Sequence, residues 1–502
     1  MNELKSGAAL NYAVILLNII VGLLYTPYML RALGQSEYGM YSLVASVISC
    51  LTVLDLGLGN AVVRYTAHFR ADGRAAEIPR LLGMFLAMYI GVGILSMVCG
   101  GVLYVNFDGW FAASMTPLEL HDARLMLLLL VANVAFTFPM SVFGSVLTAY
   151  ERFVFPRVLQ IARIVLSTVL MVVLLSLGFK ALALVVVQTL FNVAVLCAQM
   201  VYARSRLGVR IRFRGFDKEL LRQVAVYSFW VFLSVVMDRI YWSTGQMVLA
   251  FYDGTAQVAV FAVAIQLSLL YMTFSTAISG VFLPRLTTMV AQCASDTEMS
   301  RLFLRTGRIQ YMVMALVLSG FVVFGRSFVY LWAGTGYDDT YLITLIFFFA
   351  LTIPMIQNVG IGILQARNRL KFRSLLYLLI ASISLLMQFL LAPRYGGVGV
   401  ACAIAGALLV GQGVAMNLYY HYRQKLDIQA FWRSIGRMSV VPLLMSIGAT
   451  LSLLRVSIST WGGLCLAICV YLCVYVPLFW RWSMNGEERA AVRAIIRKRL
   501  PI

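Results

Sequence analysis

The sequence predicts an all-α polytopic membrane protein with about fourteen transmembrane helices, arranged as two parallel six-helix lobes followed by two further helices. The 502 residues are 62% hydrophobic and only 12% charged, and the mean hydropathy is +0.89. A water-soluble protein of this composition could not cover its surface with polar groups, so lipid must surround most side chains. Recurring apolar runs and a weak internal repeat are the other two observations that predict this fold.

Fourteen apolar runs define the expected helices in chain order. Each run has roughly 17–30 residues with few or no charges, close to the ~20 residues that a helix needs to cross ~30 Å of hydrocarbon. Continuous runs of this length exclude a closed β-barrel, whose strands are short and alternate in polarity. We expect helices near residues 8–30, 38–60, 81–105, 125–148, 157–179, 181–203, 223–250, 257–283, 309–332, 341–364, 374–393, 397–420, 437–455 and 460–481.

The first run could be mistaken for a signal peptide because Lys5 precedes it. It is too long for one and contains Asn11, Asn18 and Pro27. It also lacks a clear small-residue cleavage site before Arg31. We therefore expect this run to be the first spanning helix.

The distribution of charge predicts the topology. With both termini and loops 2–3, 4–5, 6–7, 8–9, 10–11 and 12–13 on one side, that side holds 32 of the 40 Lys and Arg residues. The opposite loops hold six, and only Arg163 and Arg239 lie within spans. By the positive-inside rule both termini are cytoplasmic. Anionic lipid headgroups then explain the net charge of +20, and no nucleic-acid partner is expected.

The cysteines do not indicate a metal site. Cys465, Cys469 and Cys473 form a stripe at helical spacing on the last expected helix, but no histidine or carboxylate accompanies them. Small residues that pack between helices explain the stripe better than metal ligands do. We expect no metal, no cofactor and no catalytic residue.

Three pairs of segments match between the two halves of the chain, each at a junction of corresponding helices. The pairs, at shifts of 217 to 220 residues, are Gly34–Tyr41 with Gly254–Phe261, Leu147–Arg152 with Leu364–Arg369, and Leu177–Lys180 with Arg394–Gly397. Because six is an even number of helices, both copies enter the membrane in the same orientation, and the substrate path is expected between the two lobes.

The repeat predicts the division of the chain. We expect a first lobe at residues 1–215, a second at 216–430, an appended helix pair at 431–482 and a cytoplasmic tail at 483–502. The tail begins with a sequence that resembles a capping box at Asn485–Glu488, and its apolar and basic residues separate onto different helical faces. These features predict an amphipathic helix that lies at the membrane surface.

Arg163 is the first candidate for a substrate-binding residue. A charged side chain deep in a bilayer costs on the order of 2.5–3.5 kcal/mol by insertion scales, so it rarely persists without a role or a partner. Gln160 and Ser167 share the helical face of Arg163. A guanidinium in such a polar stripe suits an anionic group such as a phosphate.

Helix 7 carries a second polar group. Asp238 and Arg239 are adjacent and point about 100° apart. Trp242 and Gln246 continue the face of Arg239, and an indole beside amide and guanidinium groups could hold a sugar ring. Asn18 matches Asp238 in the repeat, so both lobes place a polar residue at this depth.

Two further candidates lie on the second helix. Asp55 lies in the segment Leu54–Asn60, and Arg64 follows nine residues later, toward the cytoplasmic end. Either could line the mouth of a cavity. Asp55 and Asp238 are also the candidates for binding a coupling ion. For all of these charged residues the alternative is an interhelical ion pair that only fixes packing.

The same region resembles a known family. Pro27–Gly34, Glu37–Ser42 and Leu54–Asn60, followed by Arg64, resemble the opening of the polysaccharide biosynthesis proteins. These are the O-antigen (Wzx-type) and exopolysaccharide flippases of the multidrug/oligosaccharidyl-lipid/polysaccharide (MOP) exporter superfamily, to which the MATE exporters also belong.

The resemblance implies a function as well as a fold. It implies a flippase of the bacterial cytoplasmic (inner) membrane that moves an undecaprenyl-pyrophosphate-linked oligosaccharide by alternating access. The implied partners are this lipid-linked oligosaccharide, membrane lipids, a proton or sodium ion for coupling, and other membrane proteins of polysaccharide assembly. The family motif does not assign Arg64, Arg163 or Arg239, which are candidates from the residues alone.

Three other functions compete with this one. A cation-coupled multidrug exporter of the MATE type would use the two acidic residues named above. A membrane glycosyltransferase or polymerase usually displays acidic residues on a sizeable outer loop, whereas the longest outer loop here spans only 106–123, and no GxxxxGK[ST] phosphate loop occurs. A structural scaffold would have no use for the buried charges.

Overall fold

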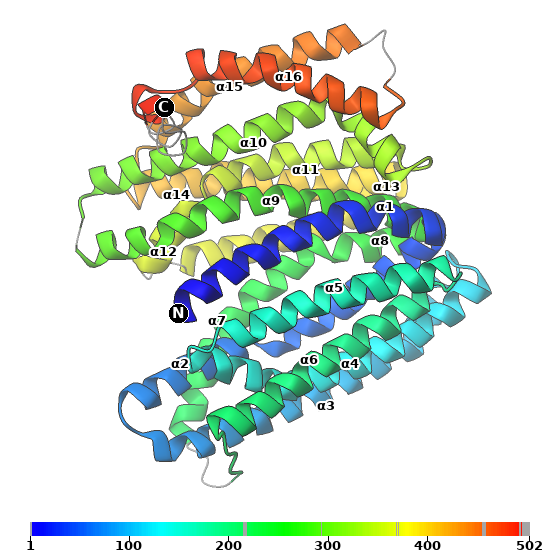
Figure 1. The fold of residues 1–502 in the computed structure, drawn as a ribbon, viewed down its shortest axis with the longest axis vertical. Coiled ribbons are helices and arrows are strands. Elements are labelled where there is room, and N and C mark those ends of the chain that lie inside the picture. Colours follow the sequence, from blue (N-terminus) through cyan, green and yellow to red (C-terminus); the bar gives the residue numbers. More distant parts are fainter. Residues whose placement is uncertain are drawn as a thin grey trace. The chain divides into compact units, whose positions relative to one another are not determined.

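A computed structural model describes residues 3–213, 218–292, 294–367, 369, 371–453, 458–490 and 493. Within these residues the regular secondary structure is helical, with no strand (Figure 1). Eleven of the described helical stretches are long and apolar enough to cross a membrane. The chain is therefore a multi-pass membrane protein.

The fourteen predicted spans all have helical counterparts. Two of the eleven stretches, Ala9–Ala71 and Lys371–Tyr422, have 63 and 52 residues, which is enough for two crossings each. Non-helical glycines, Gly34 and Gly396, divide these two stretches at the predicted junctions. The remaining predicted span, near 223–250, coincides with two shorter helices that meet at Ser243.

The described helices fall into two compact units. The first contains Met1–Ala262 and Leu385–Val400. Within it, α4 packs against both α3 and α6, and α1 packs against α5 (Figure 1). Its elements are α1 (Glu3–Leu51), η1 (Thr52–Asp55), α2 (Leu58–Ala71), η2 (Ala75–Glu77), α3 (Ile78–Phe111), α4 (Pro117–Ala149), α5 (Val154–Ser176), α6 (Ala181–Leu207), α7 (Lys218–Trp242), α8 (Thr244–Tyr252) and the start of α9 (Gly254–Ala291).

The second unit contains Val263–Ser384 and Ala401–Ile502. In it α10 is the central helix, because α11, α15 and α16 all pack against it. Its elements are the rest of α9, α10 (Asp296–Ala333), α11 (Asp338–Ile356), α12 (Asn358–Ala366), α13 (Lys371–Leu408) apart from Leu385–Val400, the π-helix η3 (Leu409–Ala415), α14 (Met416–Tyr422), α15 (Ile428–Leu453) and α16 (Trp461–Trp482). The two units are defined by contacts in space and not by the sequence repeat. The predicted lobe boundary at residue 215 therefore stays a prediction.

The predicted repeat has matching backbone geometry in its two copies. Gly34 and Gly254, which the repeat aligns, have φ values of 77° and 79°, a left-handed conformation that favours glycine. The aligned hairpins likewise contain Gly178 at φ 85° and Gly396 at φ 52°. Glycines with positive φ at corresponding junctions support a duplicated chain.

The aligned helix ends agree in their hydrogen bonds. The Arg152 amide donates to the Leu147 carbonyl at 2.9 Å, and the Arg369 amide donates to the Leu364 carbonyl at 2.8 Å. Each bond closes the C-terminal end of a helix, α4 in the first copy and α12 in the second. Capping of this kind satisfies carbonyls that a helix end would otherwise leave unpaired.

The α5–α6 hairpin is attached to α1 by an ion pair. Lys180 Nζ lies 2.7 Å from Glu37 Oε1, and the hydrogen bond to Glu37 raises the pKa of the Lys180 amine. Because the Lys180 side chain is exposed, we assign this pair a role in positioning the hairpin and no large share of stability.

The backbones of α1 and α9 approach each other closely at Gly39. A Cβ atom at this position would lie 1.8 Å from the Thr255 carbonyl oxygen and 3.2 Å from the Ala259 nitrogen. We expect Gly39→Ala to destabilise the protein by about 1–3 kcal/mol, because two helix backbones must separate. The measurement is thermal unfolding of the purified protein in detergent.

The matched control is Gly101→Ala. Gly101 is also helical and lies on α3, where an added Cβ atom would have no neighbour within 4 Å. We expect no loss there, since alanine is the better helix former. Equal unfolding temperatures for the two variants would contradict the close approach.

Two predicted segments lie partly outside the described residues. Of the connection 204–222, the structure describes 204–213 and 218–222, and the Arg212 amide donates to the Pro79 carbonyl at 2.9 Å. Of the tail at 483–502, the structure describes 483–490 and 493. Its predicted capping box is present in part, since the Asn485 amide donates to Glu488 Oε2 at 2.7 Å.

Candidate functional site

The second transmembrane span of the first unit is broken where Asp55 lies. The chain leaves α1, forms one 3-10 turn at η1, and passes through Leu56 at φ 53° and Gly57 at φ 68° before α2 begins. A non-glycine residue in this left-handed region costs roughly 1–2 kcal/mol. Unwound segments inside membrane helices are tolerated where protein or water surrounds them, and they often form binding sites.

The break places Asp55 beside α3. Asp55 is half-buried, and the buried Tyr89 is close enough to interact electrostatically with its carboxylate. On α2, a Cβ at Gly59 would lie 3.5 Å from the Tyr89 hydroxyl oxygen and 3.4 Å from Ser145 Oγ. Small residues in this segment therefore let polar side chains of α3 and α4 approach the broken backbone.

Arg163 lies in a second polar cluster, formed by α4, α5 and α6. Its Nη1 donates to Asn192 Oδ1 at 3.2 Å. Asn192 Nδ2 in turn donates to Asn133 Oδ1 at 2.9 Å and to Thr137 Oγ1 at 2.8 Å. We call these four residues the asparagine network.

The asparagine network holds the arginine without neutralising it. Within the described residues, Arg163 has no carboxylate in ion-pair range, and Nη1 is its only nitrogen with a described hydrogen bond. The side chain is half-buried. A guanidinium that is positioned by neutral amides keeps its positive charge and most of its donors for an anion.

Arg239 lies near the break that contains Asp55. It is half-buried on α7, the helix that packs against η1 and α2. It is close enough to Cys50 of α1 to interact electrostatically with it. Its Nε is buried and has no hydrogen-bond partner in the described part of the chain, so this nitrogen has an unmet bonding requirement.

The neighbours of Arg239 divide between exposed and buried positions. Asp238 is exposed and Trp242 is half-buried. Gln246 is buried, and its Oε1 accepts a hydrogen bond of 2.9 Å from Ser42 Oγ. It therefore joins α8 to α1, whereas the sequence pattern placed it on the face of Arg239.

The remaining candidates are more peripheral. Arg64 is exposed on α2, and Asn18 is exposed on α1, where Nδ2 donates to the Val14 carbonyl at 3.0 Å. Gln160 Oε1 accepts a hydrogen bond of 2.8 Å from Arg157, one turn before it on α5. The roles of these three residues in binding stay predictions.

The structure thus separates the candidates into two clusters. Asp55 lies in the broken second span, with Arg239 of the neighbouring helix α7 near it, whereas Arg163 and Gln160 lie on α5. Sequence analysis did not single out Asn133 and Asn192 as partners of Arg163. The sequence feature that could have indicated them is the i, i+4 spacing of two polar pairs, Asn133 with Thr137 and Gln188 with Asn192. This spacing shows that each pair shares one face of a helix, but it does not show which helices face each other.

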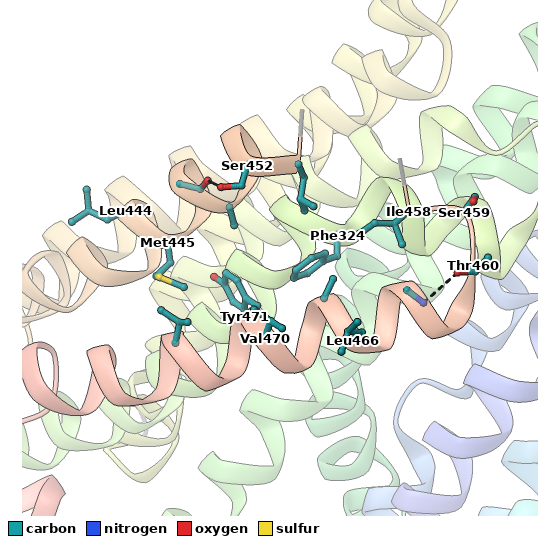
Figure 2. A pocket seen from close by; sticks show the side chains of 16 residues that line it. Phe324, Leu444, Met445, Ser452, Ile458, Ser459, Thr460, Leu466, Val470 and Tyr471 are labelled. Atoms are coloured by element: carbon teal, nitrogen blue, oxygen red, sulfur yellow. Dashed lines mark hydrogen bonds between the residues drawn. The ribbon is translucent and has the colours of Figure 1, made fainter. Parts of the chain in front are cut away.

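The second unit contains an apolar groove of about 610 Å³ along α10, α15 and α16. Figure 2 shows Phe324, Leu466, Val470 and Tyr471 around it. The rings of Phe324 and Tyr471 pack edge to face with their centroids 5.6 Å apart. A groove with this lining suits a hydrocarbon chain better than a sugar.

The described residues contain no group of three or more His, Cys, Asp or Glu side chains that could hold a metal ion. Cys465, Cys469 and Cys473 are exposed on α16. Their placement fits a lipid-facing or packing stripe.

Comparison with known proteins identifies the family. The sequence pattern of the polysaccharide biosynthesis protein family matches residues 4–290, which is more than half of the chain. The chain belongs to this family. The predicted resemblance, which rested on the first 70 residues, is confirmed.

One relative is an uncharacterized membrane protein, EpsK, of Bacillus subtilis strain 168. It is 20% identical to this chain over 97% of both proteins. The similarity extends over both repeats, so it is not confined to the matched opening motifs.

Two solved structures show the same fold. The lipid II flippase MurJ in an inward closed conformation aligns with a TM-score of 0.70 and 15% identity, over 95% of this chain and 98% of that one. An inward-facing multidrug resistance MATE transporter of the MOP superfamily aligns with a TM-score of 0.64 and 13% identity, over 83% and 99%. The chain therefore shares its fold with these two proteins.

Proposed function

We propose that this family member is a flippase of the bacterial cytoplasmic membrane that translocates an undecaprenyl-pyrophosphate-linked oligosaccharide by alternating access. The observation that carries the proposal is Arg163, a half-buried cation in a spanning helix whose described partner is the neutral Asn192. A cation kept inside a membrane protein without a neutralising carboxylate favours an anionic cargo. Membership in a polysaccharide biosynthesis family makes a lipid-linked sugar the fitting cargo.

The two parts of such a cargo would require different surfaces. The pyrophosphate requires fixed cations, for which Arg163, Arg239 and Arg64 are the candidates. The sugar suits the amide of Gln160, the Asn18 amide and the Trp242 ring. The polyprenyl chain requires an apolar path, and the groove along α10, α15 and α16 has the lining for it.

The proposed topology places both termini in the cytoplasm, as the positive-inside rule predicts. Depletion of the protein tests the function. The expected result is accumulation of lipid-linked oligosaccharide that faces the cytoplasm, with loss of surface polysaccharide. Unaltered glycolipid pools together with new drug sensitivity would instead identify a multidrug exporter. The same cells can test whether other polysaccharide-assembly membrane proteins are required as partners.

The alternative of a cation-coupled exporter is favoured by Asp55. This carboxylate is half-buried at a helix break, a place where membrane transporters bind protons or sodium ions. Coupling of this kind would also serve a flippase, so Asp55 bears on the energy source in both cases. Asp238, which is exposed, is the weaker of the two candidates.

We expect Asp55→Asn to remove the dependence of transport on a proton or sodium gradient while leaving protein abundance unchanged. The amide has the shape of the carboxyl group but cannot bind a cation by charge. The measurement is transport in proteoliposomes with imposed gradients, and Asp55→Glu is the control that keeps the charge. Gradient-driven transport that persists in Asp55→Asn would show that Asp55 does not couple.

A further inference from the structure

Three connections of the second unit converge on one strongly basic cavity. These are the α9–α10, α12–α13 and α14–α15 connections, all of which the charge distribution assigns to the cytoplasmic side. The cavity has a volume of about 470 Å³. Its polar lining consists of four cations, one carboxylate and one amide: Arg367, Arg369, Arg423, Lys425, Asp296 and Gln424.

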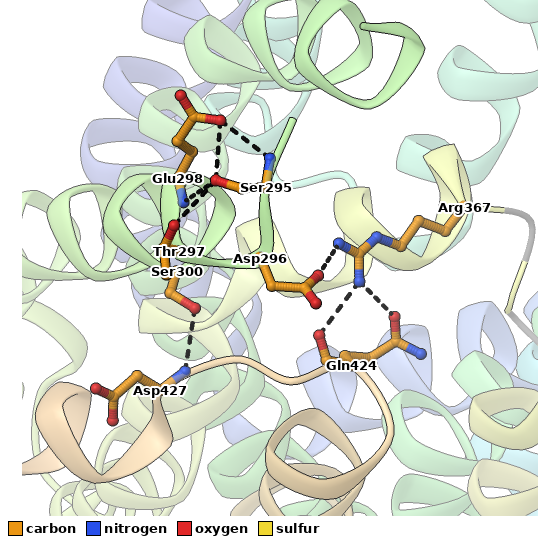
Figure 3. A network of polar contacts seen from close by, with 8 residues as sticks. All are labelled: Ser295, Asp296, Thr297, Glu298, Ser300, Arg367, Gln424 and Asp427. Carbon is orange, nitrogen blue, oxygen red and sulfur yellow. Dashed lines mark hydrogen bonds and ion pairs between the residues drawn. The ribbon is translucent and has the colours of Figure 1, made fainter. Parts of the chain in front are cut away.

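Arg367 is held at the centre of this group by three acceptors. Its Nη1 donates to both the main-chain oxygen and Oε1 of Gln424, each at 3.2 Å. Its Nη2 donates to Asp296 Oδ1 at 2.8 Å (Figure 3). Gln424 is only 1% exposed, so the two uncharged acceptors of Arg367 are fixed in the protein interior.

Asp296 is the more exposed partner in its ion pair with Arg367. Its side chain is 43% exposed, against 20% for Arg367. An exposed ion pair contributes little to stability, with a median near 0–1 kcal/mol. A better anion could therefore displace the Asp296 carboxylate from Arg367 at small cost, while Gln424 keeps the guanidinium in place.

The other three cations surround this pair. Arg369, Arg423 and Lys425 are exposed, and within the described residues none of them forms an ion pair. Lys425 has φ 54°, a conformation unusual for a lysine. The next residue, Leu426, is 1% exposed and its amide donates to the Tyr420 carbonyl at 3.0 Å, which fixes the loop that presents Lys425.

Two other carboxylates close to the cavity, those of Glu298 and Asp427, bond main-chain amides at the starts of helices. Ser295 and Glu298 form a complete capping box at the start of α10, so their side chains serve their own helix. Asp427 is likewise occupied, since its Oδ1 accepts a hydrogen bond from the Ala430 amide at 2.9 Å. Neither Glu298 nor Asp427 lines the cavity, so its lining holds four cations and one carboxylate.

Two of these four cations have no basic counterpart in the first copy of the repeat, where Tyr150 and Gly208 stand at the positions of Arg367 and Lys425. Arg152, which corresponds to Arg369, is paired with Glu3 at 3.2 Å. A basic cluster that served only as a topology signal would need no cavity and no displaceable carboxylate. The difference between the copies indicates a role specific to the second unit.

We propose that this cavity is a binding site for a phosphate or pyrophosphate group, with Arg367 as its positioned centre and Arg369, Arg423 and Lys425 as its surrounding cations. Several cations around a fixed guanidinium are the usual means of binding phosphate oxygens. The group has two sources, a soluble phosphate compound or the headgroup of an anionic lipid. The site does not depend on what the protein transports.

The test compares two double variants of the full-length protein. Arg369→Gln with Lys425→Gln removes two cavity charges, and Arg433→Gln with Arg437→Gln removes two exposed charges from the neighbouring helix α15, which does not line the cavity. Binding of inorganic pyrophosphate is measured in detergent, and binding of phosphatidylglycerol is measured in nanodiscs with phosphatidylcholine as the reference lipid.

We expect the cavity variant to bind at least about tenfold more weakly than the control, because charge-assisted hydrogen bonds are lost. We expect Asp296→Asn to bind more tightly, since the competing carboxylate is gone. An effect with pyrophosphate alone identifies a soluble ligand, and an effect with phosphatidylglycerol alone identifies a lipid. Equal affinities of the two double variants, or no binding by the wild-type protein to either probe, would overturn the proposal.

Discussion

Replacing Arg163 by alanine is expected to lower transport of the proposed cargo about 10- to 100-fold while the protein still folds. Hydrogen bonds to a charged group contribute about 1.5–3 kcal/mol, and each 1.4 kcal/mol is a factor of ten. Folding should persist because Asn192 keeps its bonds to Asn133 and Thr137. The measurements are surface polysaccharide in complemented deletion cells and membrane abundance of the variant.

Two further variants separate the charge from its position. Arg163→Lys keeps the charge but not the paired donors, so it should recover part of the activity. Asn192→Ala keeps the guanidinium and removes its described partner, so it should cause a smaller loss than Arg163→Ala. Normal surface polysaccharide in Arg163→Ala, at unchanged abundance, would favour a structural scaffold and contradict a binding role.

The fold was predictable because the bilayer imposes a length on each helix. Apolar runs had to fit the hydrocarbon thickness, and the described helices follow those runs. The junction glycines were also visible as aligned residues, and Gly34 and Gly254 have nearly the same φ. The backbone is non-helical at Gly34, with φ 77° and ψ 172°, so the first two spans separate there as the sequence predicted.

The helix breaks were less predictable. The second span unwinds at η1, and another ends at Ser243 where α8 begins. Both segments are apolar enough to be read from the sequence as continuous spans, so hydropathy alone did not reveal the breaks. The π-helix at Leu409–Ala415 is a further departure from a regular α-helix that the apolar run did not indicate.

The candidate site was predictable by residue type and not by partner. Burial cost pointed to Arg163 and Asp55, and both lie in polar clusters. Their partners Asn192 and Tyr89 come from other helices, and only the fold brings them together. The sequence also did not indicate that Arg308 is buried against a carboxylate. Its partner, Glu488, lies 180 residues away in the chain.

Arg308 and Glu488 attach the described start of the C-terminal tail to α10. Nε donates to Oε1 at 2.5 Å and Nη2 donates to Oε2 at 2.7 Å, while Nη2 also donates to the Ser483 carbonyl. The two side chains are 4% and 12% exposed. Ser434 of α15 accepts a further hydrogen bond from Nη1, so one guanidinium joins three segments of the second unit.

Glu488→Ala is expected to destabilise the protein by about 3–5 kcal/mol, because it leaves a buried guanidinium without its counter-charge. The measurements are thermal unfolding in detergent and proteolysis of the tail, which should become faster. Arg305→Ala is the control. This arginine is exposed one turn earlier on the same helix, and its loss should change stability by no more than about 0.5 kcal/mol.

A double variant distinguishes a requirement for charge from a requirement for packing. Arg308→Met with Glu488→Leu removes both charges and fills similar volume, so it should regain most of the stability that Glu488→Ala loses. If the double variant is as unstable as Glu488→Ala, the hydrogen bonds of Arg308 to Ser434 and Ser483 carry the stabilisation instead of the ion pair. If Glu488→Ala unfolds at the wild-type temperature, the tail is not held by this contact.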